Sequence, residues 1–235
     1  MLKNFIFKFF FFSGLVTICL LFLPSLILPS KFASFGGRLS GHWAELCLKI
    51  FLSTKVTVIG RENIIQNEKF FIACTHQSMF ETFYLQKIFK APFFVLKKEL
   101  INIPIFGIYL KKIGCISISR GKVDRENLDF LNKINVSFLK SNRPLVIFPQ
   151  GTRHGTEERP SFKKGAGRIY DLKIKCQPVV MNSGDVWPKT GKVRSGKELK
   201  ISILKPLELG IENNKFTEIL QNRMYQELDK MVNPS

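Results

Sequence analysis

The chain has 235 residues and a formal net charge of +18, with a pI near 9.9. This length predicts one domain with a short appendage and enough apolar residues to bury a sizeable core. The excess positive charge favours anionic partners, namely nucleic acid, an anionic membrane surface or phosphorylated ligands. The basic residues are dispersed, and the sequence has neither zinc-finger spacing nor an aromatic RNA-binding signature, which argues against nucleic acid.

The five cysteines are odd in number, widely spaced and set in apolar surroundings: Cys19, Cys47, Cys74, Cys115 and Cys176. This pattern is typical of small core residues in a reducing compartment. The sequence contains no Cys-x-x-Cys pair and no Cys/His cluster, so we expect no metal site.

Residues 9–28 carry no charge. As a single helix they would extend about 30 Å, which is enough to cross the apolar core of a bilayer. Pro24 would kink that helix, so a re-entrant or interfacial helix is one alternative, and a cleaved signal peptide is another. We favour a membrane anchor because the apolar stretch is long and no convincing cleavage site follows. Lysines on both sides leave the orientation open.

Residues 38–52 predict a second helix with an apolar stripe, which is equally consistent with a core-facing helix and with a helix lying on a membrane surface. The stripe comprises Leu39, Trp43, Leu46, Cys47, Ile50 and Phe51. We therefore divide the chain into an N-terminal, membrane-associating segment of two apolar helices, residues 1–53, and a larger domain, residues 54–235.

Strand and helix patterns alternate in the larger domain. Apolar runs predict strands at 56–60, 70–74, 93–96, 113–119, 144–148, 179–182 and 199–204. Helices are expected between His76 and Lys90, over part of 100–110 with breaks at Pro104 and Gly107, over 121–139, and over 216–231. This alternation predicts an α/β layer sandwich.

His76 follows the predicted strand at 70–74, and Glu81 lies five residues further on. On one continuous helix the two side chains would point about 140° apart. We therefore predict that His76 lies in a strand-to-helix loop and Glu81 in the first helical turn. There the carboxylate accepts the proton of one ring nitrogen and leaves the other nitrogen free as a base. The alternative is a structural histidine with satisfied hydrogen bonds.

Basic residues follow three further strands. Lys98 follows the strand at 93–96, and Arg120 ends another, where its guanidinium can bind phosphate oxygens through two parallel hydrogen bonds. Gly151 lets backbone N–H groups approach an anion, and Thr152 and Arg153 add donors. Taken singly, these segments have structural alternatives: a lysine at a strand end is usually just solvated, and the loop with Arg153 can be a turn with a surface arginine.

Together, and in this order, these segments resemble the motifs of the glycerolipid acyltransferase family, in particular of its bacterial 1-acyl-sn-glycerol-3-phosphate acyltransferases. The resemblance covers roughly residues 56–205, and four motifs in order are a specific signal where one would be weak. The matches are His76-x4-Glu81 to a histidine-x4-aspartate motif, Ile118-Ser119-Arg120 to the second motif, residues 148–153 to a proline-glutamate-glycine-threonine-arginine motif, and residues 177–180 to the last motif, which ends near residues 182–184.

The chain departs from the family pattern at four positions. Glu81 stands for the usual aspartate, Gln150 for the usual glutamate, Ser119 for a common aspartate and Thr75 for an asparagine. We interpret these changes as subfamily variation, because the histidine, a carboxylate and the arginines remain.

The resemblance implies a mixed, mostly parallel sheet flanked by helices. It also implies acyl transfer from acyl-CoA or acyl-carrier protein, as co-substrate and without a cofactor, to the sn-2 hydroxyl of lysophosphatidic acid, giving phosphatidic acid. His76 would act as the base and Glu81 would orient it. The residues that would bind the phosphate or shape its loop are Lys98, Arg120, Gly151, Thr152 and Arg153.

The resemblance further implies an enzyme of phospholipid biosynthesis at the bacterial inner membrane, with its active site facing the cytoplasm. Its partners would be lysophosphatidic acid, the acyl donor and the membrane surface, and not nucleic acid. One alternative is acyl transfer to glycerol-3-phosphate or a lyso-aminolipid. Another is a non-catalytic binder of anionic lipid, which would need the arginines but not His76 with Glu81. A nucleic-acid-binding protein ranks last, because it leaves residues 9–28 unexplained.

Overall fold

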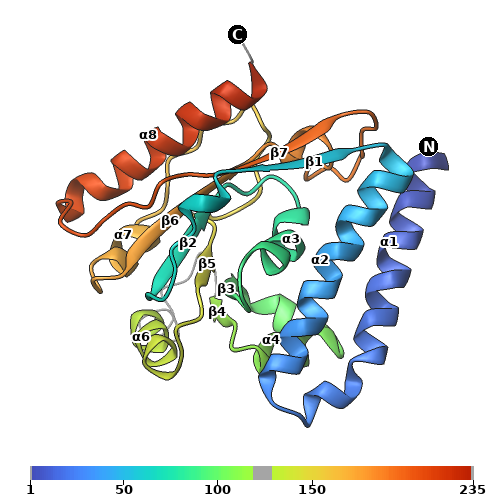
Figure 1. Cartoon of the computed structure of the whole chain (residues 1–235), viewed down its shortest axis with the longest axis horizontal. Coiled ribbons are helices and arrows are strands. Elements are labelled where there is room, and N and C mark those ends of the chain that lie inside the picture. The colour runs from blue at the N-terminus through green and yellow to red at the C-terminus, as the bar shows by residue number, and fades with distance from the viewer. Residues whose placement is uncertain (1, 119–128, 234–235) are drawn as a thin grey trace.

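In the computed structural model, which describes residues 2–118 and 129–233, the chain forms a seven-stranded sheet in the order β1-β7-β6-β2-β5-β3-β4 (Figure 1). Only β6 and β7 are antiparallel neighbours; every other adjacent pair is parallel. The predicted mixed, mostly parallel sheet is therefore confirmed. The strands are β1 (Lys55–Ile59), β2 (Phe70–Cys74), β3 (Phe93–Lys97), β4 (Ile116–Ile118), β5 (Leu145–Ile147), β6 (Lys175–Met181) and β7 (Glu198–Ile203).

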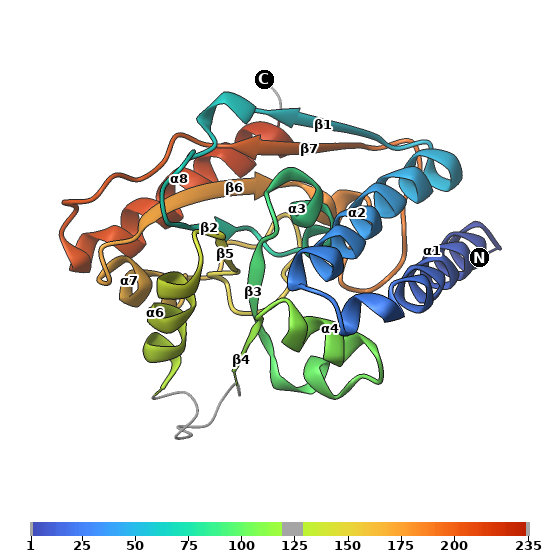
Figure 2. The same ribbon diagram turned by 60° about the horizontal axis from the view of Figure 1, so that its bottom comes forward.

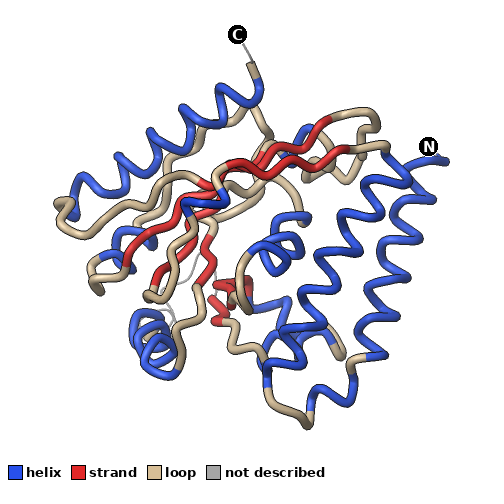
Figure 3. Tube along the Cα trace, in the orientation of Figure 1, coloured by secondary structure: helices blue, strands red, loops and turns tan. Residues whose placement is uncertain are grey.

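Helices cover both faces of the sheet (Figure 3). The α-helices are α1 (Leu2–Leu21), α2 (Ser30–Leu52), α3 (Phe80–Ile88), α4 (Phe106–Lys112), α6 (Phe130–Lys140), α7 (Gly165–Tyr170) and α8 (Asn213–Val232). Short 3₁₀ turns are η1 (Leu23–Leu26), η2 (Arg61–Asn63), η3 (Lys98–Asn102) and η4 (Ser183–Asp185). In Figures 1 and 2, α1 and α2 lie side by side on one side of the sheet, and α8 lies on the other.

Each face of the sheet has its own hydrophobic core. Successive residues of a strand point to opposite faces. In β2, Phe70, Ile72 and Cys74 pack in the core formed with α1, α2 and α3, whereas Phe71 and Ala73 pack in the core formed with α6, α7 and α8. All five are buried, which explains why β2 is a continuous apolar run in the sequence.

The N-terminal helices differ from their prediction. The uncharged stretch 9–28 is not one helix, because α1 ends at Leu21 and the chain reverses through η1 before α2 begins at Ser30. Pro24 is the second residue of η1 and Pro29 immediately precedes α2, which are positions where the missing proline N–H costs little. Among the described residues only α1 is long and apolar enough to cross a membrane, so one such helix is present rather than two.

The apolar stripe of α2 is divided between the core and the surface, with Cys47 buried and Trp43 and Phe51 packed against the core. Leu39, Leu46 and Ile50 are 38%, 45% and 61% exposed. The helix packs against α3 through small residues: a Cβ added at Gly41 would lie 2.7 Å from the carbonyl oxygen of Phe83. Cys47, Leu48 and Leu52 are buried in the core, so α2 has a core-facing side and an exposed apolar side.

Gly107 does not break a helix as predicted, since it lies within α4. A Cβ there would lie 1.9 Å from the carbonyl oxygen of Ile101, so glycine is needed for close packing and not for a turn. Pro104 precedes α4, as expected. The helix predicted over 121–139 is seen as α6 from Phe130 onward, and residues 119–128 lie outside the described part of the chain.

Candidate active site

The carboxyl ends of β2, β3, β5 and β6 meet at one edge of the sheet, because these strands are parallel. His76 follows β2, the loop 148–153 follows β5, Lys98 follows β3 and Ser183 follows β6. The sheet thus gathers segments that are far apart in the sequence.

His76 and Glu81 adopt the predicted geometry. His76 lies in the loop between β2 and α3, and Glu81 is the second residue of α3. Nδ1 of His76 lies 3.3 Å from Oε2 of Glu81, and the two side chains are 13% and 0% exposed. Because the carboxylate faces Nδ1, Nε2 is the ring nitrogen that is left to accept a proton.

The buried carboxylate of Glu81 is surrounded by donors. It accepts the backbone N–H of Gln77 at 3.1 Å and that of Ser78 at 2.9 and 3.1 Å to its two oxygens. It also accepts the hydroxyl of Ser183, which is itself fully buried. These donors offset the cost of removing a charge from water and fix the position of the carboxylate.

The loop after β5 is fastened to the loop that carries His76. The imidazole of His76 stacks on the ring of Phe148, with centroids 3.9 Å apart and an interplanar angle of 18°. The backbone N–H of His76 donates to Oε1 of Gln150 at 2.6 Å, and its carbonyl accepts the N–H of His154 at 2.9 Å. The histidine is therefore held by its ring and by both sides of its backbone.

Gln150 is buried and plays a positional role in these contacts. Its Nε2 lies 3.4 Å from the hydroxyl of Tyr225, which donates to the carbonyl of Pro160 at 2.5 Å. Its Oε1 meanwhile accepts from His76. A neutral amide satisfies both contacts, so this part of the site requires no negative charge at position 150.

Gly151 has a φ of +79°, a conformation that side chains with a Cβ rarely adopt. Its N–H donates to the carbonyl of Phe148 at 2.9 Å and closes a tight turn. Thr152 and Arg153 follow, both half-buried. Within residues 2–118 and 129–233 the Arg153 guanidinium makes no hydrogen bond or ion pair, which leaves it available to an anion.

Of the other two predicted phosphate ligands, the structure describes Lys98 alone. Lys98 is the first residue of η3 and is exposed, at the same edge of the sheet. Its strand β3 is separated from β2 by β5, a lateral distance of about 10 Å at roughly 4.8 Å per strand. Arg120 lies outside the described residues.

Sequence reasoning missed a second histidine–carboxylate pair, which lies in the loop after β5. Nδ1 of His154 lies 2.7 Å from Oε2 of Glu158, and Oε1 of Glu158 accepts the N–H of Gly155 at 2.9 Å. These two hydrogen bonds lower the pKa of the Glu158 carboxyl below its ordinary value. The pair has a four-residue spacing outside any helix, so a search at the spacing of His76 and Glu81 passes over it.

The contact of Ser183 with Glu81 was also missed, and the only sequence signal for it was the position of Ser183 beside the last motif.

Cys74 ends β2 beside this site, and Cys176 lies near the start of β6, at the opposite end of the sheet. Burial raises the pKa of the Cys74 and Cys176 thiols well above the ordinary value, so neither is a thiolate nucleophile. Among the described residues no group of three or more His, Cys, Asp or Glu side chains could hold a metal ion.

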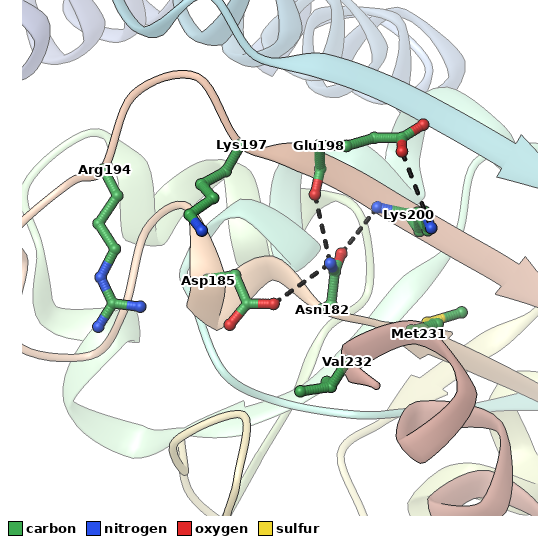
Figure 4. A pocket seen from close by; sticks show the side chains of 8 residues that line it. All are labelled: Asn182, Asp185, Arg194, Lys197, Glu198, Lys200, Met231 and Val232. Atoms are coloured by element: carbon green, nitrogen blue, oxygen red, sulfur yellow. Dashed lines mark hydrogen bonds and ion pairs between the residues drawn. The ribbon is translucent and has the colours of Figure 1, made fainter. Parts of the chain in front are cut away.

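A cavity of about 330 Å³ lies beside η4 (Figure 4). Asn182, Asp185 and three cations line it, namely Arg194, Lys197 and Lys200, whereas His76 and Glu81 do not. The candidate site at His76 is therefore defined by hydrogen bonds and stacking and not by this cavity.

Comparison with known proteins shows a family to which the chain is similar over more than half of its length. The family model described as "Acyltransferase" matches residues 55–182. A 1-acyl-sn-glycerol-3-phosphate acyltransferase of Saccharomyces cerevisiae is 33% identical over 191 residues, which cover 78% of this chain and 62% of that protein. The protein of the same name from Pseudomonas aeruginosa is 32% identical over 154 residues, covering 64% of this chain and 59% of the relative. The chain thus spans about three-fifths of the length of these two curated relatives.

One solved structure is similar over its whole length. It is described as the 1-acyl-sn-glycerophosphate (LPA) acyltransferase from Thermotoga maritima, and it superposes with a TM-score of 0.81 at 17% sequence identity. The match covers 100% of this chain and 98% of the other. At that identity the likeness shows a shared fold.

Proposed function

Because the chain belongs to the acyltransferase family, we propose that it transfers an acyl group from acyl-CoA or acyl-carrier protein to the sn-2 hydroxyl of 1-acyl-sn-glycerol-3-phosphate, giving phosphatidic acid. The observation that carries this proposal is the buried His76–Glu81 pair beside the turn at Gly151, at the carboxyl edge of the sheet. The names of the relatives support the choice of acceptor.

In this mechanism Nε2 of His76 takes the proton of the substrate hydroxyl as the hydroxyl oxygen attacks the thioester carbonyl. Glu81 holds Nδ1 and stabilises the imidazolium that forms, which is the role of the acid in a catalytic triad. The substrate oxygen is the nucleophile, so no acyl-enzyme is needed. The thiol of the donor leaves with the proton. General-base assistance of this kind contributes about 10²–10⁴-fold to the rate.

The substrate phosphate is bound by cations and by the turn after β5. Arg153 and Lys98 supply positive charge, and Gly151 with Thr152 shapes the loop that approaches the phosphate. Arg120, in the corresponding position after β4, is assigned to the same role from its sequence motif alone. Arginine suits this task because its planar guanidinium matches two phosphate oxygens.

We further propose that the enzyme works at the cytoplasmic surface of a bacterial inner membrane, with residues 1–53 as the anchoring segment and residues 54–235 as the catalytic domain. The apolar helix α1 supports this proposal, because only 17% of its 18-residue apolar stretch is buried inside the protein. The exposed apolar side chains of α2 support it too. An acceptor with one acyl chain is itself amphipathic and reaches the site from the lipid surface.

The test is acyl transfer from labelled acyl-CoA and labelled acyl-carrier protein to lysophosphatidic acid, comparing the wild type with His76→Ala. We expect phosphatidic acid from the wild type and a loss of at least about a hundredfold in the variant. His42→Ala, which removes an exposed histidine of α2, is the matched control and should retain wild-type activity.

Other results would redirect or end the proposal. A wild type that acylates only glycerol-3-phosphate or a lyso-aminolipid would keep the reaction and change the acceptor. A His76→Ala variant as active as the wild type would remove His76 as the base. Binding of anionic lipid without turnover of any of these acceptors would identify a non-catalytic lipid-binding protein.

A further inference from the structure

The turn η4 contacts the carboxylate that orients His76. Ser183 begins this turn, directly after Asn182, and is fully buried. Its hydroxyl donates to Oε1 of Glu81 across 102 residues of sequence, while Oε2 of the same carboxylate faces Nδ1 of His76. Ser183 is thus a side-chain donor to Oε1, which also accepts the backbone N–H of Gln77, while Oε2 faces the histidine.

The turn is held in place on both sides of Ser183. On one side, Oδ1 of Asn182 accepts the N–H of Lys200 at 2.7 Å and its Nδ2 donates to the carbonyl of Glu198 at 3.2 Å, which ties the turn to β7 (Figure 4). On the other, the N–H of Gly184 donates to Oε1 of the buried Gln77 at 2.9 Å. The serine hydroxyl therefore sits on a fixed support.

The turn η4 packs closely against its neighbours at Gly184. A Cβ added at Gly184 would lie 2.7 Å from Oγ1 of Thr156 and 3.1 Å from the side chain of Gln77. Thr156 belongs to the loop after β5, and Gln77 is the neighbour of His76. The loop that carries His76 and the loop after β5 thus both pack against the turn that carries Ser183.

A glutamate at this position needs such a contact more than an aspartate would. Its side chain has one more rotatable bond, and rotation of the carboxylate about the last torsion is only weakly restricted. The N–H of Ser78 lies close to both oxygens, at 2.9 and 3.1 Å, and so does not select one of them. The Ser183 hydroxyl donates to Oε1 together with the backbone N–H of Gln77 at 3.1 Å, and the two donors leave Oε2 for His76.

We propose that Ser183 is a positioning residue for the acyl transfer: through its hydrogen bond it fixes the carboxylate of Glu81 in the orientation that aligns the imidazole of His76. This inference rests on the proposed function. Ser183 touches neither the substrate nor the reacting atoms, and it acts only through Glu81.

The first measurement compares Ser183→Ala with Ser202→Ala. Ser202 is a matched control, because it is a buried serine of β7 whose hydroxyl donates at 2.7 Å to Oε1 of Glu227, a residue of α8 on the other side of the sheet from α3. We expect kcat to fall about tenfold in Ser183→Ala with KM within twofold, since a misaligned base slows the chemical step. Ser202→Ala should keep the wild-type kcat although it loses a similar hydrogen bond.

The second measurement is a double-mutant cycle with Glu81→Ala. If Ser183 acts through Glu81, adding Ser183→Ala to Glu81→Ala causes no further loss of kcat. An equal tenfold loss in both backgrounds, or no loss in the wild-type background, would overturn the proposal.

A third readout does not depend on turnover. The Nδ1 proton of His76 resonates downfield when it is hydrogen-bonded to the carboxylate, and we expect this NMR signal to move upfield in Ser183→Ala but not in Ser202→Ala. An unchanged signal in Ser183→Ala contradicts the positioning role. If the wild type proves inactive on lysophosphatidic acid while the signal shifts as expected, the proposed acceptor fails and the positioning of His76 by Ser183 stands.

Discussion

The loops at the carboxyl edge hold two histidine–carboxylate pairs that differ in their surroundings. In the first, Glu81 is fully buried, and its partner His76 is held by a stacked ring and two backbone hydrogen bonds. In the second, Glu158 is 60% exposed although its contact with His154 is shorter, 2.7 Å against 3.3 Å. The shorter distance therefore does not mark the better catalytic pair.

What separates the pairs is the cost of misalignment. A buried carboxylate must keep its hydrogen-bond donors, so it holds its histidine in one orientation. An exposed carboxylate exchanges its partner for water at little cost. The first pair can therefore serve as an aligned base, whereas the second braces the loop between Arg153 and Pro160.

The largest expected effect is the loss of activity when Glu81 is neutralised, compared with the matched neutralisation of Glu158. Glu81→Gln should lower kcat for acyl transfer by about a hundredfold or more, because an amide cannot stabilise the imidazolium and can select the wrong tautomer of His76. Glu158→Gln, the matched change in the other pair, should stay within about twofold. Steady-state rates with lysophosphatidic acid check both, and equal losses in the two variants would end the distinction between the pairs.

A smaller effect should follow from removing the stacked ring. Phe148→Ala frees the imidazole of His76 on one face, and we expect kcat to fall about tenfold as its orientation broadens. Phe138→Ala is the control, since it removes a buried ring of α6 that packs on Phe93. Phe138→Ala should lower the free energy of unfolding by about 3–5 kcal/mol, which is more than the loss in Phe148→Ala. Its activity should fall less than that of Phe148→Ala. A Phe148→Ala variant that loses stability and activity in the same proportion as the control would contradict the role of the stack.

The smallest effect concerns acid stability in the exposed pair. Hydrogen bonds from His154 and Gly155 lower the pKa of the Glu158 carboxyl from its ordinary 4.5. A lowered folded-state pKa means that this contribution to stability is present above the ordinary value and is lost as the pH falls through the folded-state value. Wild type and Glu158→Gln should therefore differ slightly in Tm at neutral pH and converge in acid, below the folded-state pKa. A difference that grows on acidification would show the opposite sign.

Much of the architecture could be predicted because local patterns have local causes. The apolar run at residues 70–74 predicted a strand, and the five-residue offset between His76 and Glu81 predicted a loop followed by a helix start. The end of α1 was placed wrongly, since an uncharged stretch records apolar content but not where the chain reverses. Which residues of the stripe on α2 are buried and which are exposed depends on the neighbours the helix packs against, which no single segment specifies.

The sequence by itself determined the alternation of strands and helices, the histidine with its carboxylate, and the loop chemistry that suits a phosphate. Only the tertiary structure decided that Ser183 meets Glu81, that Gln150 holds the backbone of His76, and that Glu158 stays in water. These contacts join positions up to 102 residues apart. They follow from the order of parallel strands, which aligns the ends of β2, β5 and β6, and hydrogen bonds formed across such distances leave no periodic trace in the chain.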